Sequence, residues 1–278
     1  MRLGTVKLDE GTRAFRQDET GTYYFPHHAD IGEVLRSQDW REFPLEQGEA
    51  PEADALTMPI LRPSKIICAG LNYYAHAEEV GKTAPDVPTL FSKVATSLVS
   101  PRGDIHLPPL STQIDWEGEL VVVIGNYVKN ANAEIARESI LGYTVINDLS
   151  VRDWQRRTSE WFQGKNFDES SPLGPVIVTA DEVDPQKGLS IQTRVNGVLE
   201  QDGTTADLIF SPVDLVMYIS QFLTLEPGDL IATGTPAGVG TARKPPLYLR
   251  DGDVLNTSIE GIGELTNIIR IGDLDQEI

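Results

Sequence analysis

From Pro63 onward, the chain alternates short apolar runs with turns rich in glycine and proline. The segment Ser100–Asp104 reads Ser-Pro-Arg-Gly-Asp, in which proline presets one turn dihedral and glycine permits a left-handed backbone. Further turns of this kind are expected at Pro108–Pro109, Pro172–Pro175 and Glu226–Asp229. Many short strands separated by such turns are typical of a β-rich core that is closed or sandwich-like.

Three helical segments are expected to interrupt the strands. They cover Asn72–Val80, Val151–Phe162 and Pro212–Leu223, and the last two carry apolar stripes at helical spacing that should pack against the core. Ser150 is well placed to cap the second helix, because a serine side chain can accept a hydrogen bond from the first turn.

Residues 1–60 differ from the rest of the chain and predict a separate small unit, followed by a larger one over residues 61–278. The polar, acidic stretch Phe43–Asp54 contains two prolines and predicts a linker. The expected elements of the small unit are strands at Arg2–Leu8 and Thr22–Phe25 and a short helix at Ile31–Gln38.

Two glutamates, Glu117 and Glu119, stand one residue apart at the start of a β-branched run that ends at Gly125. Side chains two apart on a strand share a face, so both carboxylates point toward a predicted interior. Asp148 ends a second apolar stretch, Gly142–Asp148. A buried carboxylate costs several kcal/mol unless it is compensated, and three together favour a hard cation such as Mg²⁺ or Mn²⁺.

The alternative interpretation of these acids is the polar face of a half-exposed strand. Trp116 and Leu120 would then supply the buried face. Against it, the glutamate face continues as Val121 and Val123, so the same side turns apolar. Spacing by itself specifies a face and leaves the partner open.

The composition excludes several classes of function. The net charge of −19 and the pI of about 4.5 disfavour binding to nucleic acid or to an anionic membrane. Four histidines and one cysteine exclude a cysteine-rich zinc site, and Cys68 is expected to be a buried structural thiol. The N-terminus has no apolar signal region and no run reaches membrane-spanning length, so we expect a cytoplasmic protein.

Taken together, four segments resemble the fumarylacetoacetate hydrolase family over about Lys65 to Gly261. They are Gly70–His76 (GLNYYAH), Asp115–Leu120 (DWEGEL), Asn147–Asp153 (NDLSVRD) and Gly228–Gly240 (GDLIATGTPAGVG). The resemblance implies an α+β, β-rich fold, in which a mixed β-roll catalytic domain follows a small N-terminal α/β accessory domain. It also implies one divalent cation, Mg²⁺ or Mn²⁺ with Ca²⁺ as an alternative, whose ligands fall on Glu117, Glu119 and Asp148.

The resemblance also assigns roles to other residues. His76 and Glu79, three apart on a predicted helix, match a catalytic pair on a lid, and Lys165 matches an active-site lysine. Gln201 and Thr235 match positions that contact substrate in relatives. The alternative interpretations are a surface histidine with a chance acidic neighbour and a solvated lysine. Arg152 and Asp153 are expected to form a supporting ion pair.

The expected function is hydrolysis of a C–C bond in a 2,4-dioxo acid, such as an acylpyruvate or fumarylpyruvate, through a metal-stabilised enolate. The His76–Glu79 pair favours hydrolysis, because a general base is needed to activate water. The alternatives are an oxaloacetate-type decarboxylase or a 2-hydroxy-dienedioate isomerase, and, outside catalysis, a dicarboxylate receptor or purely structural acids. The expected partners are a small 2-oxo acid and a second copy of the chain in a homodimer.

Overall fold

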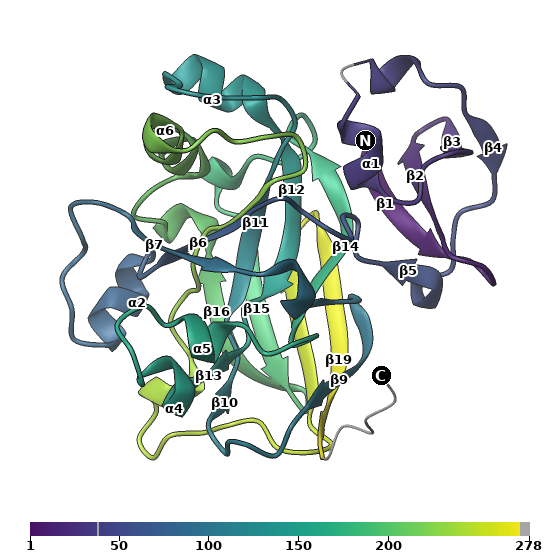
Figure 1. Cartoon of the computed structure of the whole chain (residues 1–278). Helices are drawn as coiled ribbons and strands as arrows, with labels where there is room; N and C mark the ends of the chain where they lie inside the picture. The colour runs from purple at the N-terminus through teal and green to yellow at the C-terminus, as the bar shows by residue number, and fades with distance from the viewer. Residues whose placement is uncertain (38, 273–278) are drawn as a thin grey trace.

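A large mixed sheet organises the protein, as seen in a computed structural model that describes residues 1–37 and 39–272 (Figure 1). Its main path runs through ten strands, with β5 (Leu56–Thr57) paired to β1 and β8 (Leu98–Val99) paired to β14. The order along the path is β4 (Glu46–Gly48), β3 (Gly21–Tyr24), β2 (Thr12–Asp18), β1 (Arg2–Lys7), β14 (Ser171–Thr179), β12 (Ile140–Asn147), β11 (Gly118–Ile124), β17 (Leu230–Ala232), β6 (Ile66–Gly70) and β7 (Thr89–Lys93).

A second sheet packs against the first and closes the core. Its five strands follow the order β16 (Val198–Thr204), β15 (Ser190–Val195), β18 (Val254–Ile259), β19 (Gly263–Ile271) and β9 (Arg102–Leu107). Alternate residues of β15 and β18 are buried, as expected for a sheet with one face toward the core. One hydrophobic cluster joins both sheets, with Val122 from the first and Ile191 from the second. The β-rich fold predicted from the turn pattern is therefore confirmed.

Strand β11 lies in the middle of the large sheet and is buried along its whole length. Leu120 and Val122 pack into the cluster shared with the second sheet, whereas Val121 and Val123 pack into a cluster on the opposite face. A strand covered on both faces reads as a continuous apolar run, which explains the β-branched sequence here. Glu117 and Glu119 lie on the Val121 side, at the end of the strand where this apolar packing stops.

The N-terminal strands extend the large sheet rather than forming a detached unit. They stand to one side of the main body (purple in Figure 1), and β1 pairs with β14 through Arg2↔Val178 and Leu3↔Ile177. The predicted linker at Phe43–Asp54 is wrong, because β4 within it pairs with β3. The predicted helix there is shorter, as α1 covers Ile31–Leu35, and Gln38 lies outside the described residues. A division near residue 60 stays a prediction.

Helices are few and short, and the structure confirms two of the three predicted in the main domain. These are α2 (Tyr74–Glu79) and α6 (Pro212–Phe222). Helix α6 begins with a capping box in which the Ser211 side chain accepts from the Asp214 backbone and the Asp214 carboxylate accepts from Ser211. A further helix, α3 (Ala133–Ser139), lies beside α6 at one end of the sheets (Figure 1).

The prediction of one helix over Val151–Phe162 is wrong, and the irregular structure found there positions residues of the site. Ser150 and Val151 form a strand, β13, that pairs with β10 (Ile114–Asp115). The helical remainder divides into α4 (Arg152–Gln155) and α5 (Phe162–Lys165), separated by a left-handed backbone at Trp161, where φ is 61°. Ser150 caps neither helix, because its hydroxyl donates to the Asp148 carbonyl at 2.9 Å.

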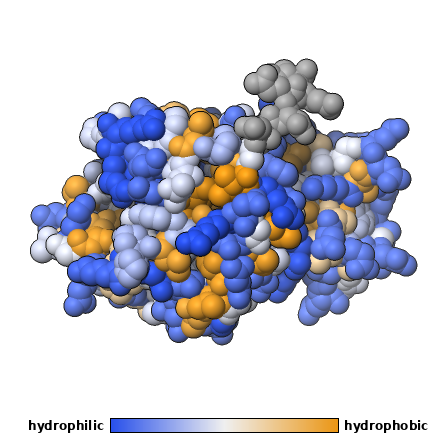
Figure 2. Space-filling model, turned by 90° about the horizontal axis from the view of Figure 1, so that it is seen from below, coloured by the Kyte–Doolittle hydropathy of each residue, from blue (hydrophilic) through white to orange (hydrophobic). Residues whose placement is uncertain are grey.

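Figure 2 shows a face of the molecule on which hydrophilic and hydrophobic side chains are mixed. On this face, hydrophobic patches are interrupted by hydrophilic side chains, as expected for a chain with 42 acidic and 23 basic residues. Among the described residues, no helix is both long enough and apolar enough to cross a membrane. Cys68 is buried in β6 and forms no disulfide, as predicted.

Candidate active site

Three buried carboxylates meet where β11 begins and β12 ends. Ligand oxygens of Glu117, Glu119 and Asp148 all lie within 4.8 Å of one another. The antiparallel register pairs Gly118 with Asn147, which brings the residues flanking the two strand ends together. The Asp148 backbone N–H donates to the Glu117 carbonyl at 2.7 Å and fixes this junction. The structure thus brings together the three residues predicted as metal ligands.

The three acids experience different surroundings. Burial opposes the charge on Glu117, but the cations of Lys165 and Arg152 outweigh it and lower its pKa from 4.5 to about 2. Burial raises the pKa of Glu119 well above its ordinary value, and the neighbouring Asp148 and Glu117 carboxylates raise it further. The Glu119 carboxylate accepts one hydrogen bond, from the Gly234 N–H at 2.8 Å. Among the described residues, no cationic group contacts it.

Two lysines neutralise the other side of the acid cluster. Lys165 Nζ lies 2.5 Å from Glu117 Oε2 and 2.6 Å from Asp148 Oδ2, and Lys93 Nζ lies 2.9 Å from Asp148 Oδ1. Burial opposes the charge on Lys165, but the Asp148 and Glu117 carboxylates prevail and raise its pKa. Lys165 is therefore held as an ammonium ion against the acids, and its predicted catalytic role stays a prediction.

Arg152 supports the acid cluster from the opposite side, and the ion pair predicted between Arg152 and Asp153 is wrong. Arg152 Nε donates to Asp115 Oδ2 at 2.7 Å, and its Nη2 lies 2.7 Å from Glu117 Oε1. Asp153 instead accepts from the Ser111 hydroxyl. The reason is helix geometry, since neighbouring residues on a helix point in different directions.

The donor set fits a hard divalent cation. Carboxylate oxygens are the ligands that Mg²⁺ and Mn²⁺ prefer, and within the described part of the chain the buried Glu119 carboxylate has no positive charge in direct contact with it. A divalent ion between Glu117, Glu119 and Asp148 would supply that charge.

His76 and Glu79 form a hydrogen-bonded pair on α2. His76 Nδ1 lies 2.9 Å from Glu79 Oε2, while Glu79 Oε1 accepts from the Gly238 N–H at 2.8 Å. Because the ionised glutamate can only accept, Nδ1 carries the hydrogen and Nε2 is left as the basic nitrogen. The exposed Glu78 is not the partner. The pair therefore presents an oriented imidazole to the cavity described next.

A cavity of about 350 Å³ opens over the acid cluster. Its wall contains two non-glycine residues with left-handed backbones, Leu71 and Trp161, whose φ angles are 56° and 61°. The rings of Trp161 and Phe91 meet edge to face, with their centroids 5.5 Å apart. The Trp161 indole also covers Gly70 closely, since a Cβ added to Gly70 would lie 2.5 Å from the indole ring. The polar and charged residues in its lining are Glu117, Glu119, His76, Lys165, Thr235, Thr241, Arg152, Gln155, Arg156 and Lys82.

The two predicted substrate contacts occupy different positions. Thr235 lines the cavity, and its hydroxyl donates to the Gly118 carbonyl at 3.0 Å. Gln201 lies behind it and is 1% exposed. The Gln201 amide accepts from the Gly118 N–H and donates to Thr235 Oγ1 and the Pro236 carbonyl. In this structure Gln201 holds the wall of the site in place, and its predicted contact with substrate stays a prediction.

Sequence reasoning missed two residues of the site. The sequence showed Asp115 only as part of the motif Asp115–Leu120. In the structure its carboxylate accepts hydrogen bonds from the backbone N–H groups of Gly240 and Thr241 and from Arg152 Nε, so it links this loop to Arg152. Lys93 ends β7 and is 55 residues from its partner Asp148. The sequence around Lys93 does not predict its place in the site, because its partner Asp148 is distant in the chain and is brought close only by the fold.

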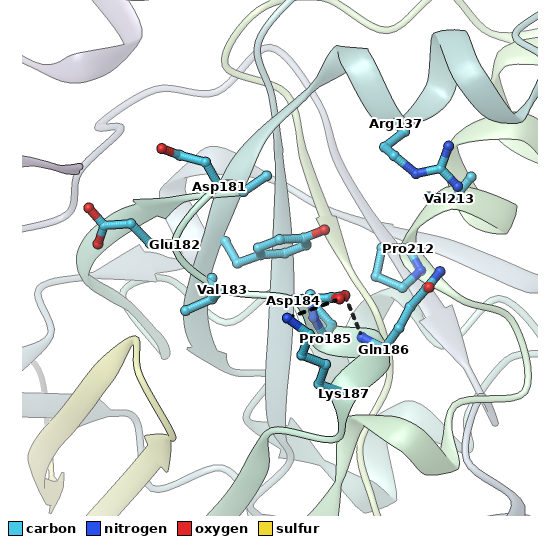
Figure 3. Close-up of a pocket in the computed structure, with 12 residues that line it drawn as sticks. Arg137, Asp181, Glu182, Val183, Asp184, Pro185, Gln186, Lys187, Pro212 and Val213 are labelled. Carbon is cyan, nitrogen blue, oxygen red and sulfur yellow. Dashed lines mark hydrogen bonds and ion pairs between the residues drawn. The ribbon is translucent and has the colours of Figure 1, made fainter.

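A second cavity, of about 340 Å³, lies at the start of α6 (Figure 3). Its acids are engaged locally or turned outward: Asp184 accepts from the Gln186 N–H at 3.0 Å and faces Lys187, while Asp181 and Glu182 point away. Among its lining residues, none belongs to the acid cluster or to the histidine pair. The acid cluster and the histidine pair therefore belong to the first cavity and not to this one.

Comparisons with known proteins agree with this geometry. The human mitochondrial oxaloacetate tautomerase FAHD2A is 46% identical over 211 residues, which cover 75% of this chain and 67% of that protein. A fumarylacetoacetate hydrolase from psychrophilic Exiguobacterium antarcticum superposes with a TM-score of 0.82 at 36% identity, covering 98% of this chain and 99% of that one. A 5-carboxymethyl-2-hydroxymuconate delta-isomerase from Mycobacterium smegmatis gives 0.80 at 36% identity, covering 98% and 100%.

The family model of the fumarylacetoacetate (FAA) hydrolase C-terminal domain matches residues 65–270. That span contains strands β6 to β18 and all but the last residue of β19, together with the acid cluster and the histidine pair. With the identities and superpositions above, it establishes that this chain belongs to the fumarylacetoacetate hydrolase family.

Proposed function

We propose that the protein is a divalent-metal-dependent enzyme that interconverts the keto and enol forms of a 2-oxo acid of the oxaloacetate kind. The observation that carries the proposal is the His76–Glu79 pair, which presents a basic nitrogen to the cavity above three buried carboxylates. Oxaloacetate tautomerases among the relatives at 46% identity support this choice of substrate. Because of these relatives, we propose tautomerisation as the first candidate reaction, ahead of the C–C hydrolysis expected from the sequence.

Glu117, Glu119 and Asp148 would hold the metal. When bound, a divalent cation supplies a Lewis acid that polarises the keto group and lowers the cost of negative charge on its oxygen. Lys165 Nζ, held within 2.6 Å of two of these carboxylates, supplies a second positive charge beside the same position. Trp161 and Phe91 limit the access of water from one side.

Tautomerisation moves one proton. The C3–H bond of the 2-oxo acid breaks, its electron pair becomes the C2=C3 double bond, and the keto oxygen gains a proton. His76 Nε2 accepts the C3 proton, Glu79 stabilises the resulting imidazolium, and the imidazolium then gives the proton to the keto oxygen, which returns His76 to its neutral form. Glu79 is itself fixed by the Gly238 N–H, so the imidazole keeps one orientation.

Hydrolysis of a 2,4-dioxo acid is the second candidate. The same pair favours it, because an imidazole oriented by a carboxylate can take a proton from water instead of from carbon. The two reactions differ in their products: tautomerisation releases nothing, whereas hydrolysis divides the substrate. Decarboxylation of oxaloacetate would also be visible, because it releases pyruvate.

The test uses His76→Asn in the metal-loaded protein. We expect Mg²⁺- or Mn²⁺-dependent loss of the ultraviolet absorbance of enol-oxaloacetate in the wild type, and a rate about 10²- to 10⁴-fold lower in the variant. Pyruvate release from oxaloacetate and from acylpyruvates is measured in parallel. Metal content after dialysis should be unchanged, because His76 lies outside the acid cluster.

His27→Asn is the matched control, since His27 is exposed and belongs to the N-terminal segment. It should keep the wild-type rate. If the wild-type protein cleaves acylpyruvates but does not change the enol absorbance of oxaloacetate, the proposed reaction is hydrolysis and not tautomerisation. If the His76→Asn variant keeps the wild-type rate in every assay, His76 is not the base in either tautomerisation or hydrolysis.

A further inference from the structure

Four basic side chains line the active-site cavity, and they fall into two pairs. Arg152 and Lys165 are engaged with Asp115, Glu117 and Asp148. Arg156 and Lys82 have no carboxylate within 4.0 Å among the residues that the structure describes. Acidic residues outnumber basic ones by 42 to 23 in this chain, so most basic side chains could find an acidic partner. Two basic side chains in one cavity without such a partner in the described part of the chain are therefore notable.

Neutral groups hold the Arg156 side chain in place. Its Nη2 donates to the Gln113 side-chain oxygen, and its Nη1 lies 3.4 Å from the Thr241 hydroxyl. These contacts orient the guanidinium without neutralising it. A guanidinium presents several N–H donors in a planar fork that matches a carboxylate, so an oriented and uncompensated one is suited to bind an anion.

Arg156 lies close to the acid cluster in the same cavity. It follows Gln155 at the end of α4, and its backbone N–H donates to the Arg152 carbonyl at 3.1 Å. The two arginines are therefore one helical turn apart on the same side of α4, and both line the cavity. Arg152 contacts Glu117 of the acid cluster. A short dicarboxylate in this cavity would therefore have the Arg156 guanidinium beside it as well as the acid cluster.

We propose that Arg156 binds the second carboxylate of a dicarboxylic 2-oxo acid and makes the site selective for short dianions over acids with an uncharged tail. The inference rests on the proposed function, in which Glu117, Glu119 and Asp148 would hold the cation that polarises the keto group. Lys82, from the segment after α2, adds positive charge to the same cavity. Arg156 acts on specificity and takes no part in the proton transfer.

The test compares two ligands that differ only at the far end. Malate carries a carboxylate where 2-hydroxybutyrate carries a methyl group. Calorimetric titration of the Mg²⁺-loaded wild type should give at least about 10-fold tighter binding of malate, since hydrogen bonds to charged groups contribute about 1.5–3 kcal/mol. In Arg156→Gln this preference should disappear, with 2-hydroxybutyrate binding unchanged. Arg156→Lys keeps the charge without the fork and should retain part of the preference.

Arg157→Gln is the control, because it removes the same charge from the next residue. Arg157 lies over the Trp154 ring at 3.5 Å and does not line the cavity. It should keep the wild-type preference for malate and the wild-type KM for oxaloacetate, whereas Arg156→Gln raises that KM with a smaller change in kcat.

The outcomes separate this inference from the proposed function. Equal or undetectable binding of the two ligands by the wild type would overturn the role of Arg156, and so would a preference that survives in Arg156→Gln. A preference that depends on Arg156, in a wild type that does not tautomerise oxaloacetate, would support the dicarboxylate site and reject the reaction.

Discussion

Glu117 is the acid whose charge the fold protects most strongly. It lies between Lys165 and Arg152, and both cations are buried with it. Removing one member of such a network leaves the others as uncompensated buried charges, which costs more than the loss of a surface ion pair. The stability of the metal-free protein should therefore depend on the ionisation of this one residue.

We predict that Glu117→Gln destabilises the metal-free protein at neutral pH and that the difference from the wild type narrows in acid. Folding lowers the pKa of Glu117 from 4.5 to about 2. Between these values the folded state binds fewer protons than the unfolded state. The contribution, on the order of 3 kcal/mol, is fully present above pH 4.5 and is lost as the pH falls toward 2.

Urea unfolding in the presence of chelator, from about pH 6 to about pH 3, measures this difference. The control is Glu46→Gln, which removes an exposed acid that lies 3.6 Å from Arg13. It should change stability by no more than about 1 kcal/mol at any pH. A constant gap between the wild type and Glu117→Gln across this range would contradict the assigned role of the ion pairs.

At the scale of elements, the site depends on a break between two short helices. The backbone turns left-handed at Trp161, and Gly164 in α5 then packs directly on α4. A Cβ at Gly164 would lie 2.3 Å from the Gln155 backbone nitrogen, closer than real atoms approach. This contact sets the position of the next residue, Lys165, against the acid cluster.

Gly164→Ala should therefore lower both stability and turnover. The added methyl has backbone atoms in its way, so α4 and α5 must separate, at a cost of about 1–3 kcal/mol. Lys165 would move with α5 and its contacts to Glu117 and Asp148 would lengthen. Thermal melts and kcat on oxaloacetate measure the two effects, and Gly272→Ala, which meets open space, is the control. Unchanged melting and turnover in Gly164→Ala would show that the contact is not required.

At the scale of the molecule, the acid cluster joins segments that are distant in the chain. Glu119 is anchored to Gly234, Asp148 to Lys93, and Glu117 to Lys165. A ligand that binds here stabilises the folded state alone, because the unfolded chain has no such cluster. The homodimer expected from the family resemblance stays a prediction at this scale.

Divalent metal should consequently raise the melting temperature. At a free concentration of about 100 times the dissociation constant, binding adds about 2.7 kcal/mol to the free energy of unfolding. We expect Mg²⁺ or Mn²⁺ to raise the melting temperature measured by calorimetry, and chelator to reverse the increase. Glu119→Gln should abolish the response. Equal melting temperatures with metal and with chelator in the wild type would argue against a cation at the acid cluster.

Local patterns in the sequence were enough to predict much of this protein. Period-two alternation placed Glu117 and Glu119 on one face of a strand, and the turn residues predicted a β-rich core. The apolar stripe predicted α6, whose bounds differ from the expected ones by a single residue. The four family motifs predicted the membership and the fold. Each of these features depends on residues close together in the chain, where backbone geometry limits the alternatives.

Only the tertiary structure decided which charges meet. The apolar face of Val151–Phe162 predicted one helix, but pairing of Ser150 and Val151 with β10 and the turn at Trp161 divided it. The chain then brought Lys93 to Asp148 and, among the described residues, left Arg156 with no carboxylate within 4.0 Å. Such contacts join residues whose distance is set by the packing of whole sheets. No short-range pattern carries that information, because the free energy that fixes it comes from closing the core.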